Sequence, residues 1–433
     1  MSLRGKWQEV LENWLRGDLG SYAPKVVLAD NPSSPGVDAF GRSRVSQSVD
    51  LFYTQFEYDD QPLFWDSWTT GSATAAHSYD MAGVILNVSG SSVALRQTRG
   101  YLRYQPGKSQ KLTFTYQHTP YALSRWQAGY FEDRDGIFLE HSGTSVSLVL
   151  RSSVSGSVSE TRVPQSQWNM DRLDGSLIPD LNPSGESLDH TMAQHLVLDM
   201  QWQGVGIARA GFYLDGQIRY AHRFRGDNSQ PYAFMRTANL PVRCELRGLA
   251  AGAFDSALQI CQAVESEGGV GEEIAQPFDA AMGHTGTSVT SRVPLMTIRP
   301  ALTFDGHANR STHIIPKELS VVTDDQGIYW ELIYGGIVSG STSWVPIGSE
   351  SAIEMDRGAN LIFGGLRVAS GYLSAGDKAT AIDLVGVNSR LRLALGIEGA
   401  HPTAFPTDNL TVVVTSLTTA TTVRASMRGK EIK

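Results

Sequence analysis

Residues 210–220 of the chain, AGFYLDGQIRY, contain the pattern that decides the fold class. Asp215 and Gly216 stand between two runs that are rich in aromatic and aliphatic residues. An Asp-Gly pair favours the type I′ turn of a β-hairpin, because both central residues of that turn need positive φ. The stretch therefore predicts two antiparallel strands joined by a two-residue turn, in a hairpin over residues 205–224.

Strand patterns of the same kind occur on both sides of this hairpin. Residues 92–104 alternate, residues 112–116 follow after a Pro-Gly turn, and residues 146–150 alternate again. A further strand is expected over residues 256–264. Regular strands with short turns indicate a sandwich of antiparallel sheets rather than a sheet built of βαβ units. We therefore expect a β-sandwich domain over residues 45–264.

The C-terminal part of the chain predicts a second, smaller β domain. Residues 265–292 are rich in Ala, Gly and Glu, which favours a linker that is flexible or partly helical. Strand patterns then resume at residues 330–334, 381–387, 391–395 and 410–414. The expected fold class is mainly β, with the second domain over residues 293–433.

The first 44 residues differ from the rest, because they carry a helical pattern. Apolar residues in segment 3–16 recur at steps of three and four, which places them on one face of a helix. These candidate assembly contacts are Leu3, Trp7, Val10, Leu11, Trp14 and Leu15. A helix this short is marginal alone and needs a surface to pack on. Its own domain, a neighbouring chain and a membrane surface are the alternatives.

Residues 29–44 predict an extended arm or a surface loop after this helix. The run 30–36, DNPSSPG, is dense in turn-forming residues and contains two prolines. Arms of this kind often lie across neighbouring subunits. The region 1–44 is therefore the expected attachment element of the chain.

Composition and charge exclude several classes of function. The formal net charge is −8, whereas nucleic-acid binding requires clustered Lys and Arg. No run approaches the ~20 apolar residues that a membrane-spanning helix needs, so no membrane insertion is expected. Cys244 and Cys261 form no CxxC pair, which favours two reduced thiols and a cytosolic place of synthesis.

Short motifs give no metal site. Asp133-Arg134-Asp135-Gly136 is similar to the start of a calcium loop, but Phe138 stands where the next ligand should be, so we expect a solvated turn. His190 and His195 are five residues apart and do not share a helix face. We therefore predict no metal and no cofactor.

Motifs for catalysis are not found either. The chain has no GxSxG nucleophile elbow and no phosphate-binding loop. A pair of acids for glycan cleavage can be dispersed in sequence. Nothing selects such a pair among the acids that stand near aromatic residues, which are Asp59, Asp60, Asp66, Glu132, Asp133 and Asp135. No catalytic residue is assigned, and the chain is predicted not to be an enzyme.

Aromatic residues are concentrated within residues 52–68. They are Phe52, Tyr53, Phe56, Tyr58, Phe64, Trp65 and Trp68. Large rings bury much area and are common in cores and interfaces. Core packing, a subunit interface and a sugar-stacking surface are the three interpretations of this cluster.

Several stretches, taken in their order, resemble a family of virion structural proteins of tailed bacteriophages. They are residues 38–45 (DAFGRSRV), 96–99 (RQTR), 104–110 (YQPGKSQ), 129–138 (GYFEDRDGIF), 165–169 (QSQWN) and 201–206 (QWQGVG), followed by the Asp-Gly hairpin. The resemblance covers residues 37–245. It implies a protein of the capsid or tail and transfers no catalytic motif.

A second resemblance concerns the fold alone. The run from Gly204 through the Asp-Gly hairpin is similar to strand pairs in lectin-like jelly rolls of the laminin-G or concanavalin type. The ligands that hold metal in such lectins are not recognisable in this chain. A jelly roll hosts many functions, so the resemblance predicts architecture and leaves the activity open.

These observations predict a non-enzymatic component of a tailed-phage virion. Closed symmetry is expected of repeated subunits, so we expect a homo-oligomer attached to other capsid or tail proteins. The analogy with phage spikes and decorations favours a trimer. A host-receptor or glycan-binding tail fibre is the alternative from the class of binding proteins. A polysaccharide depolymerase is the alternative from the class of enzymes.

Overall fold

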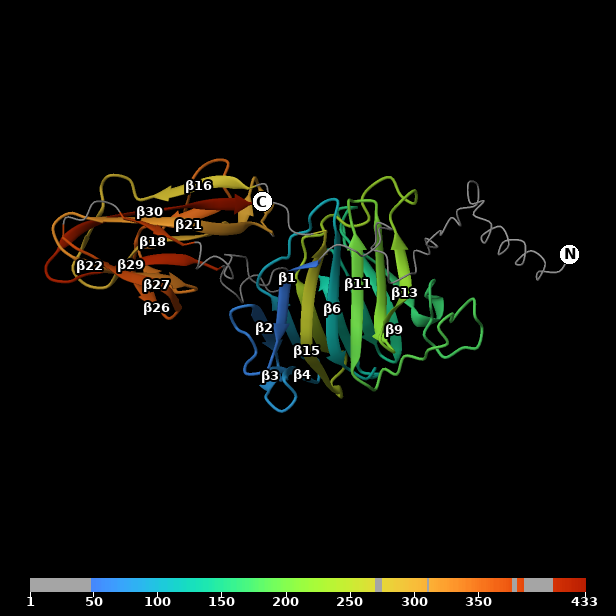
Figure 1. Cartoon of the computed structure of the whole chain (residues 1–433). Helices are drawn as coiled ribbons and strands as arrows, with labels where there is room; N and C mark the ends of the chain where they lie inside the picture. Colours follow the sequence, from blue (N-terminus) through green and yellow to red (C-terminus); the bar gives the residue numbers. More distant parts are fainter. Residues whose placement is uncertain (1–47, 269–274, 310, 376–379, 385–407) are drawn as a thin grey trace, which may run out of the picture.

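The computed structural model describes residues 48–268, 275–309, 311–375, 380–384 and 408–433, and these are almost wholly β (Figure 1). The predicted helix and arm of residues 1–44, with the six candidate assembly contacts, lie outside the described residues. The strand expected at residues 391–395 lies outside them too.

The first part is a sandwich of two antiparallel sheets that pack face to face. The eight-stranded sheet has the order β13 (Gln217–Arg225), β12 (Ile207–Leu214), β11 (Gln194–Gln201), β6 (Ser109–Gln117), β15 (Phe254–Glu267), β4 (Gly83–Ser89) and β3 (Thr74–Ser78), with β1 (Ser48–Gln55) paired to β15. The seven-stranded sheet has the order β10 (Ser159–Pro164), β9 (Ser145–Ser152), β8 (Gly136–Ser142), β7 (Ser124–Phe131), β14 (Val242–Gly248), β5 (Val93–Thr98) and β2 (Trp65–Thr70). A short 3₁₀ turn, Gln165–Gln167, follows β10.

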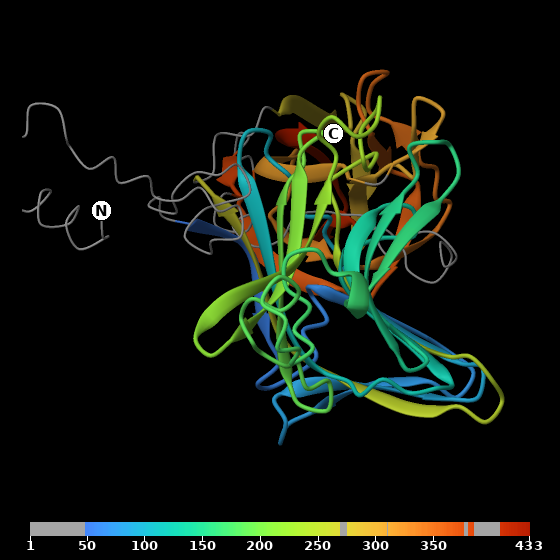
Figure 2. The same ribbon diagram turned by 90° about the vertical axis from the view of Figure 1, so that its right-hand side faces the viewer.

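The chain passes repeatedly from one sheet to the other, as in a jelly roll. Figure 2 shows the two layers from the side, with β11–β13 in green and β7–β10 in teal. This arrangement confirms the prediction of a mainly β chain in which the first β domain is a jelly-roll sandwich. Strand β15 closes the sandwich, as expected for residues 256–264.

The hairpin that decided the fold class forms as predicted. Leu214 pairs with Gln217, and the turn residues Asp215 and Gly216 have φ of 48° and 72°. Positive φ at both positions is the signature of a type I′ turn. On β12, position 211 has room only for glycine, because a Cβ there would lie 2.2 Å from the carbonyl oxygen of Arg219 on β13.

Alternating side chains explain why these segments are strands. On β6, Leu112, Phe114 and Tyr116 are buried between the sheets, whereas Lys111 and Thr113 are only partly buried. Each large apolar side chain that is fully buried stabilises the fold by about 1.5–3 kcal/mol. The core of the sandwich is therefore the space between the two sheets.

The aromatic cluster of residues 52–68 divides between core and surface. Phe56 and Trp65 are buried in the sandwich core, and their rings meet edge to face with centroids 5.9 Å apart. Tyr53 and Tyr58 are instead 69% and 75% exposed. Core packing thus accounts for part of the cluster, and the exposed tyrosines stay available for contacts.

The second part of the chain contains two larger sheets with their own core. One has the order β16 (Gln276–Ala281), β30 (Thr421–Ile432), β21 (His313–Thr323) and β28 (Thr380–Asp383), with β17 (Thr287–Val289) on β30. The other has the order β24 (Val345–Pro346), β25 (Ile353–Asp356), β18 (Val293–Pro300), β29 (Leu410–Ser416), β22 (Ile328–Tyr334) and β27 (Leu366–Leu373). Two two-stranded sheets complete this part of the chain. They pair β19 (Thr303–Phe304) with β20 (His307–Ala308) and β23 (Ile337–Gly340) with β26 (Ala359–Phe363).

The segment predicted as a linker differs from expectation. Within residues 265–292, β16 and β17 pair with β30 and so belong to the second β region. Phe278 and Ala280 on β16 point into its core. Ala and Gly have low strand propensity, so the composition of this segment gave no strand pattern. The strands form because they pair with the C-terminal strand β30.

The two parts of the chain meet at the edge of the sandwich where β1 and β2 lie (Figure 1). Arg99 of the sandwich lies 2.9 Å from the carboxylate of Asp408, and its guanidinium lies 5.8 Å from the ring centroid of Tyr334. Arg103 donates to the backbone oxygen of Lys433 at 2.9 Å. Arginine contacts thus join the sandwich to the strands that follow it.

Candidate functional site

The acidic residues that the sequence suggested as candidates for glycan cleavage fall into two groups. Asp59, Asp60 and Asp66 precede or begin β2, whereas residues 132–135 form the turn between β7 and β8. Asp66 lies 3.4 Å from Arg99, and Asp60 lies 3.5 Å from Arg96. The structure therefore places these carboxylates beside arginines and does not combine them in one catalytic pair.

The turn between β7 and β8 is not solvated, which corrects the sequence-based prediction. Asp135 is fully buried and accepts hydrogen bonds from the Ser153 amide at 3.1 Å, the Ser153 hydroxyl at 2.7 Å and the Arg236 amide at 2.9 Å. Asp133 pairs with Arg243 at 2.8 Å. The carboxylates of Asp133 and Asp135 thus accept hydrogen bonds from amide, hydroxyl and guanidinium groups. In a calcium loop the same oxygens would coordinate the ion.

A charged network covers the face of the seven-stranded sheet that points away from the core. We call it the arginine ladder, and its members are Arg151, Arg162, Arg243, Arg247, Glu140, Glu160, Glu245 and Gln127. Register places Glu245, Gln127 and Glu140 opposite one another on β14, β7 and β8. Their side chains therefore share one face.

Arginine side chains lie beside the carboxylates of the arginine ladder. Glu245 lies 3.0 Å from Arg243 and 2.9 Å from Arg247, and Glu140 lies 2.7 Å from Arg162. Burial alone would raise the pKa of Glu245, but the two arginines outweigh burial and lower its pKa to about 2. With this lowered pKa, Glu245 is a poor general acid at neutral pH.

Histidines gather at one end of the sandwich, between the sheets. His118 and His141 approach with their Nδ1 atoms 2.8 Å apart, and the Nε2 of His118 lies 2.9 Å from Asp255. Trp126 stacks on His118 with ring centroids 5.1 Å apart. His190 lies beside His141, with ring centroids 5.1 Å apart. We call these residues the histidine cluster.

Burial lowers the pKa of two histidines of this cluster, His141 and His190. Burial, aided by the charges of neighbouring histidines, lowers the pKa of His141 well below its usual value. Burial likewise lowers the pKa of His190 to about 4. Ser124 donates to Asp255 and not to His118, so the cluster lacks the serine-to-histidine contact that activates a nucleophile. Sequence reasoning missed it because its members come from positions 118 to 255.

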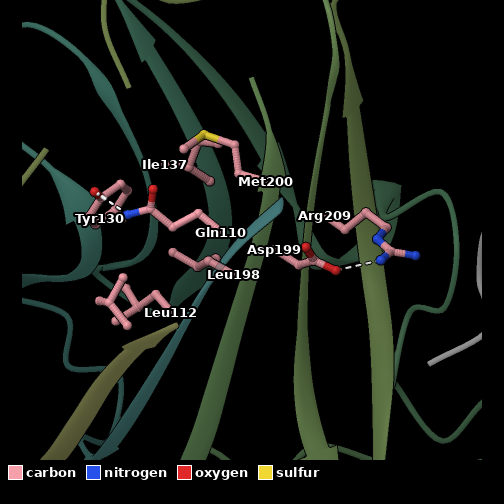
Figure 3. Close-up of a pocket in the computed structure, with 9 residues that line it drawn as sticks. Gln110, Leu112, Tyr130, Ile137, Leu198, Asp199, Met200 and Arg209 are labelled. Atoms are coloured by element: carbon pink, nitrogen blue, oxygen red, sulfur yellow. Dashed lines mark hydrogen bonds and ion pairs between the residues drawn. The ribbon is translucent and has the colours of Figure 1, made fainter. Parts of the chain in front are cut away.

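A second buried polar site lies on β11 and β12 of the eight-stranded sheet (Figure 3). The carboxylate of Asp199 pairs with Arg209 and accepts hydrogen bonds from the hydroxyls of Ser109 at 2.9 Å and Tyr220 at 2.7 Å. The adjoining cavity, which Gln110 also lines, has a volume of about 10 Å³. A cavity of this size holds at most one water molecule, so the site has no room for a substrate.

The larger candidate is a cleft of about 980 Å³ beside β1. We call it the interdomain cleft, because both parts of the chain line it. The sandwich contributes residues 50–55, 98–103 and 261–263 together with Gln61, Leu63, Phe64, Thr113 and His195, and the second part contributes His313, Tyr334 and Asp408. Its volume lies at the upper end of the range of roughly 300–1,000 Å³ that is usual for binding pockets.

The two thiols lie in different surroundings. Cys244 is buried on β14, and burial raises its pKa to about 12. Cys261 is exposed on β15 and lines the interdomain cleft. Only the second thiol is therefore placed to react with a group outside the fold.

Neither a metal centre nor a membrane span is found in the part of the chain that the structure describes. Among these residues, no three His, Cys, Asp or Glu side chains are grouped as metal ligands. None of the described helices is long and apolar enough to cross a bilayer. The predicted assembly contacts, Leu3 to Leu15, are not among the described residues.

Comparison with known proteins gives a distant likeness of fold. No protein-family model matches the chain, and no curated protein matches it either. Among solved structures, the carbohydrate esterase vb_24B_21 of the Shiga toxin-encoding bacteriophage phi24B covers 51% of this chain and 99% of its own, at 10% identity and a TM-score of 0.30. The Emp47p carbohydrate recognition domain covers 52% of this chain and 98% of its own, at 9% identity and a TM-score of 0.32.

A β-1,3-glucanase of Mycobacterium marinum is similar to the same extent. It covers 50% of this chain and 98% of its own, at 12% identity and a TM-score of 0.33. These proteins include sugar-binding domains and enzymes, and likeness at this level assigns neither activity. The chain thus shares, over half its length, a distant structural similarity with lectin-like and glucanase jelly-roll domains.

Proposed function

We propose that the chain is a non-enzymatic structural component of a tailed-phage virion. It is made in the host cytoplasm, assembles as a homo-oligomer, with a trimer as the favoured state, and attaches to other proteins of the capsid or tail. The phage assignment rests on the ordered stretches of residues 37–245. The structural role rests on the contacts described above.

The observation that carries the structural role is the pairing of carboxylates in the arginine ladder. Its ion pairs connect β8, β9 and β10, and Arg243 on β14 pairs with Glu245 on the same strand and with Asp133 in the turn between β7 and β8. Glycan cleavage requires one carboxyl group that is protonated at working pH, and Glu245 with a pKa of about 2 does not supply it. The network therefore supports a stiff sheet and argues against a depolymerase centred on Glu245.

Exposed apolar residues support the assembly part of the proposal. Tyr53, Tyr58 and Leu63 are exposed beside the interdomain cleft, and Ile337 and Phe363 form an exposed cross-strand pair on β23 and β26. Aromatic and aliphatic side chains gathered on a surface are typical of protein interfaces. Both parts of the chain thus present surface suited to contact with another subunit.

A glycan-binding tail fibre is the second candidate, and the exposed rings of Tyr53 and Tyr58 favour it. Tyrosine rings offer faces on which sugars stack, and the interdomain cleft beside them also contains polar groups. This alternative predicts that purified protein binds host surface glycan and that Tyr53→Ala abolishes the binding. A structural protein without this role would not bind the glycan.

Deletion of residues 1–44 is expected to prevent incorporation of the protein into particles, because this region contains the predicted attachment elements. The truncated protein keeps β1 and all later strands, so it should retain its β circular-dichroism spectrum. The measurement is the amount of protein in purified particles, compared with the full chain carrying the same tag. Normal loading of a folded, truncated protein would contradict the proposal.

A further inference from the structure

We infer that the interdomain cleft of one subunit binds segment 3–16 of a second copy of the chain. The inference rests on the proposed homo-oligomer and names the contact that holds it together. Four observations carry it: the lining of the cleft, the chemistry of the segment, the charge at the edge of the cleft, and the position of β1 at the start of the described chain.

The lining of the interdomain cleft is suited to an apolar occupant. Phe52 and Phe64 are only partly buried, although both pack against the sandwich core. Tyr53 and Leu63 line the same cleft and are 69% and 37% exposed. Apolar surface gathered in one concave place is stabilised when a complementary apolar face covers it.

The segment supplies such a face and requires a partner. Its six apolar residues, which include Trp7 and Trp14, fall on one side of the predicted helix. A helix of this length is not stable by itself in water, so its apolar side has to be covered. Tryptophans are also the residues that most often dominate the energy of an interface.

Charge is complementary at the edge of the cleft. The segment has the basic residues Arg4 and Lys6 near its start. The exposed acids Glu57 and Asp59 lie in the loop between Gln55 and Gln61, which both line the cleft. Opposite charges at the rim of an interface favour one orientation of the bound segment.

The connection between segment and cleft favours a neighbouring subunit. Residues 17–47 join the segment to β1, whose residues 50–55 line the cleft of the same chain. Pro32 and Pro35 favour an extended connection, and roughly 30 extended residues reach up to about 100 Å. A connection that stays extended would place the segment beyond its own cleft and within reach of a neighbouring subunit. In a closed ring, each subunit then gives one segment and receives another.

The exposed thiol of Cys261 permits a direct test, because it lines the cleft. Leu11→Cys places a second thiol on the apolar side of the segment, and a disulfide forms only when the two Cβ atoms come within roughly 3.5–4.5 Å. After mild oxidation of the purified full chain, we expect covalent dimers and trimers on a non-reducing gel. The bands should disappear on reduction and in the Leu11→Cys, Cys261→Ser double variant.

Matched controls make the result specific. Glu9→Cys places the thiol on the opposite side of the predicted helix, so it should give no covalent oligomer. Leu63→Arg, combined with Leu11→Cys, puts a charge into the cleft at a position that is already partly exposed, and it should abolish the cross-link. Equal cross-linking by Glu9→Cys and Leu11→Cys would overturn the inference.

Two further outcomes would also overturn it. A disulfide within one chain, seen as a monomer that has lost its free thiols at positions 11 and 261, would show that the segment occupies its own cleft. Free thiols after oxidation would show that the segment is elsewhere. If the cross-link is absent while deletion of residues 1–44 still blocks incorporation, the inference fails and the proposed function stands.

Discussion

Arg209→Met is expected to lower the free energy of unfolding of the sandwich by about 3–5 kcal/mol, because it leaves a buried carboxylate without its cation. Asp199 and Arg209 are 0% and 2% exposed. The guanidinium also lies 4.2 Å from the ring centroid of Tyr220, whose hydroxyl donates to the same carboxylate. Methionine fills a similar volume, so the expected loss comes mainly from charge.

Chemical denaturation followed by tryptophan fluorescence measures this effect, with Arg225→Met as the matched control. Arg225 lies on the neighbouring strand β13 and pairs with Asp227 at the surface, so its replacement should leave the transition unchanged. Adding Asp199→Leu to Arg209→Met should recover part of the loss, since a buried ion pair can be replaced by apolar residues at little cost. A transition for Arg209→Met that matches the unsubstituted chain would contradict the description of this site.

Acidification from pH 7 to pH 5 is expected to destabilise the sandwich through its buried histidines. Burial lowers the pKa of His141 well below its usual value and lowers the pKa of His190 and His222 to about 4. In the unfolded chain these groups take up protons near pH 6.5, so the unfolded state gains protons first as pH falls. Stability is therefore complete above pH 6.5 and is lost as pH falls toward 4.

Each neutral histidine contributes a slope of up to about 1.4 kcal/mol per pH unit within this window. The measurement is the free energy of unfolding at half-unit steps between pH 7 and pH 5, a range above the reference pKa of Asp and Glu side chains. His190→Asn should flatten the profile, whereas His284→Asn, an exposed position in the second part of the chain, serves as the control. A profile that is flat over this range in the unsubstituted protein would contradict the buried, neutral state of His141 and His190.

The architecture was largely predictable, because it depends on local pattern. The Asp215-Gly216 turn needs only two adjacent residues, and alternation along β6 needs only a single strand. The strands at residues 330–334 and 410–414 were found in the same way and appear as β22 and β29. Turns and strands can be predicted from a single sequence because a turn pair or an alternating strand involves only consecutive residues.

The polar sites were not predictable, because they depend on strand order and register. Glu245 meets Gln127 and Glu140 only when β14, β7 and β8 are neighbours, and β14 follows β7 by more than a hundred residues. His118 and Asp255 are likewise brought together by the pairing of β6 with β15. No local pattern predicts such a meeting, so dispersed acids and histidines could be listed but not grouped.

Asp135 illustrates a different limit. Its sequence neighbourhood, Asp-Arg-Asp-Gly, predicts a hydrated turn, and the turn does occur between β7 and β8. Ser153 and Arg236 then supply donors from other parts of the chain and permit full burial of the carboxylate. Burial of a charged turn residue is decided by tertiary partners that the turn motif does not contain.

The measurement that tests the central proposal most directly is immunogold electron microscopy of purified virions in which this chain carries an epitope tag at its C-terminus. The account predicts gold at fixed, symmetry-related positions on the capsid or the tail, in numbers that are multiples of the oligomeric state. Tagged protein that is abundant in the lysate but absent from the purified particles would contradict a structural role in the virion.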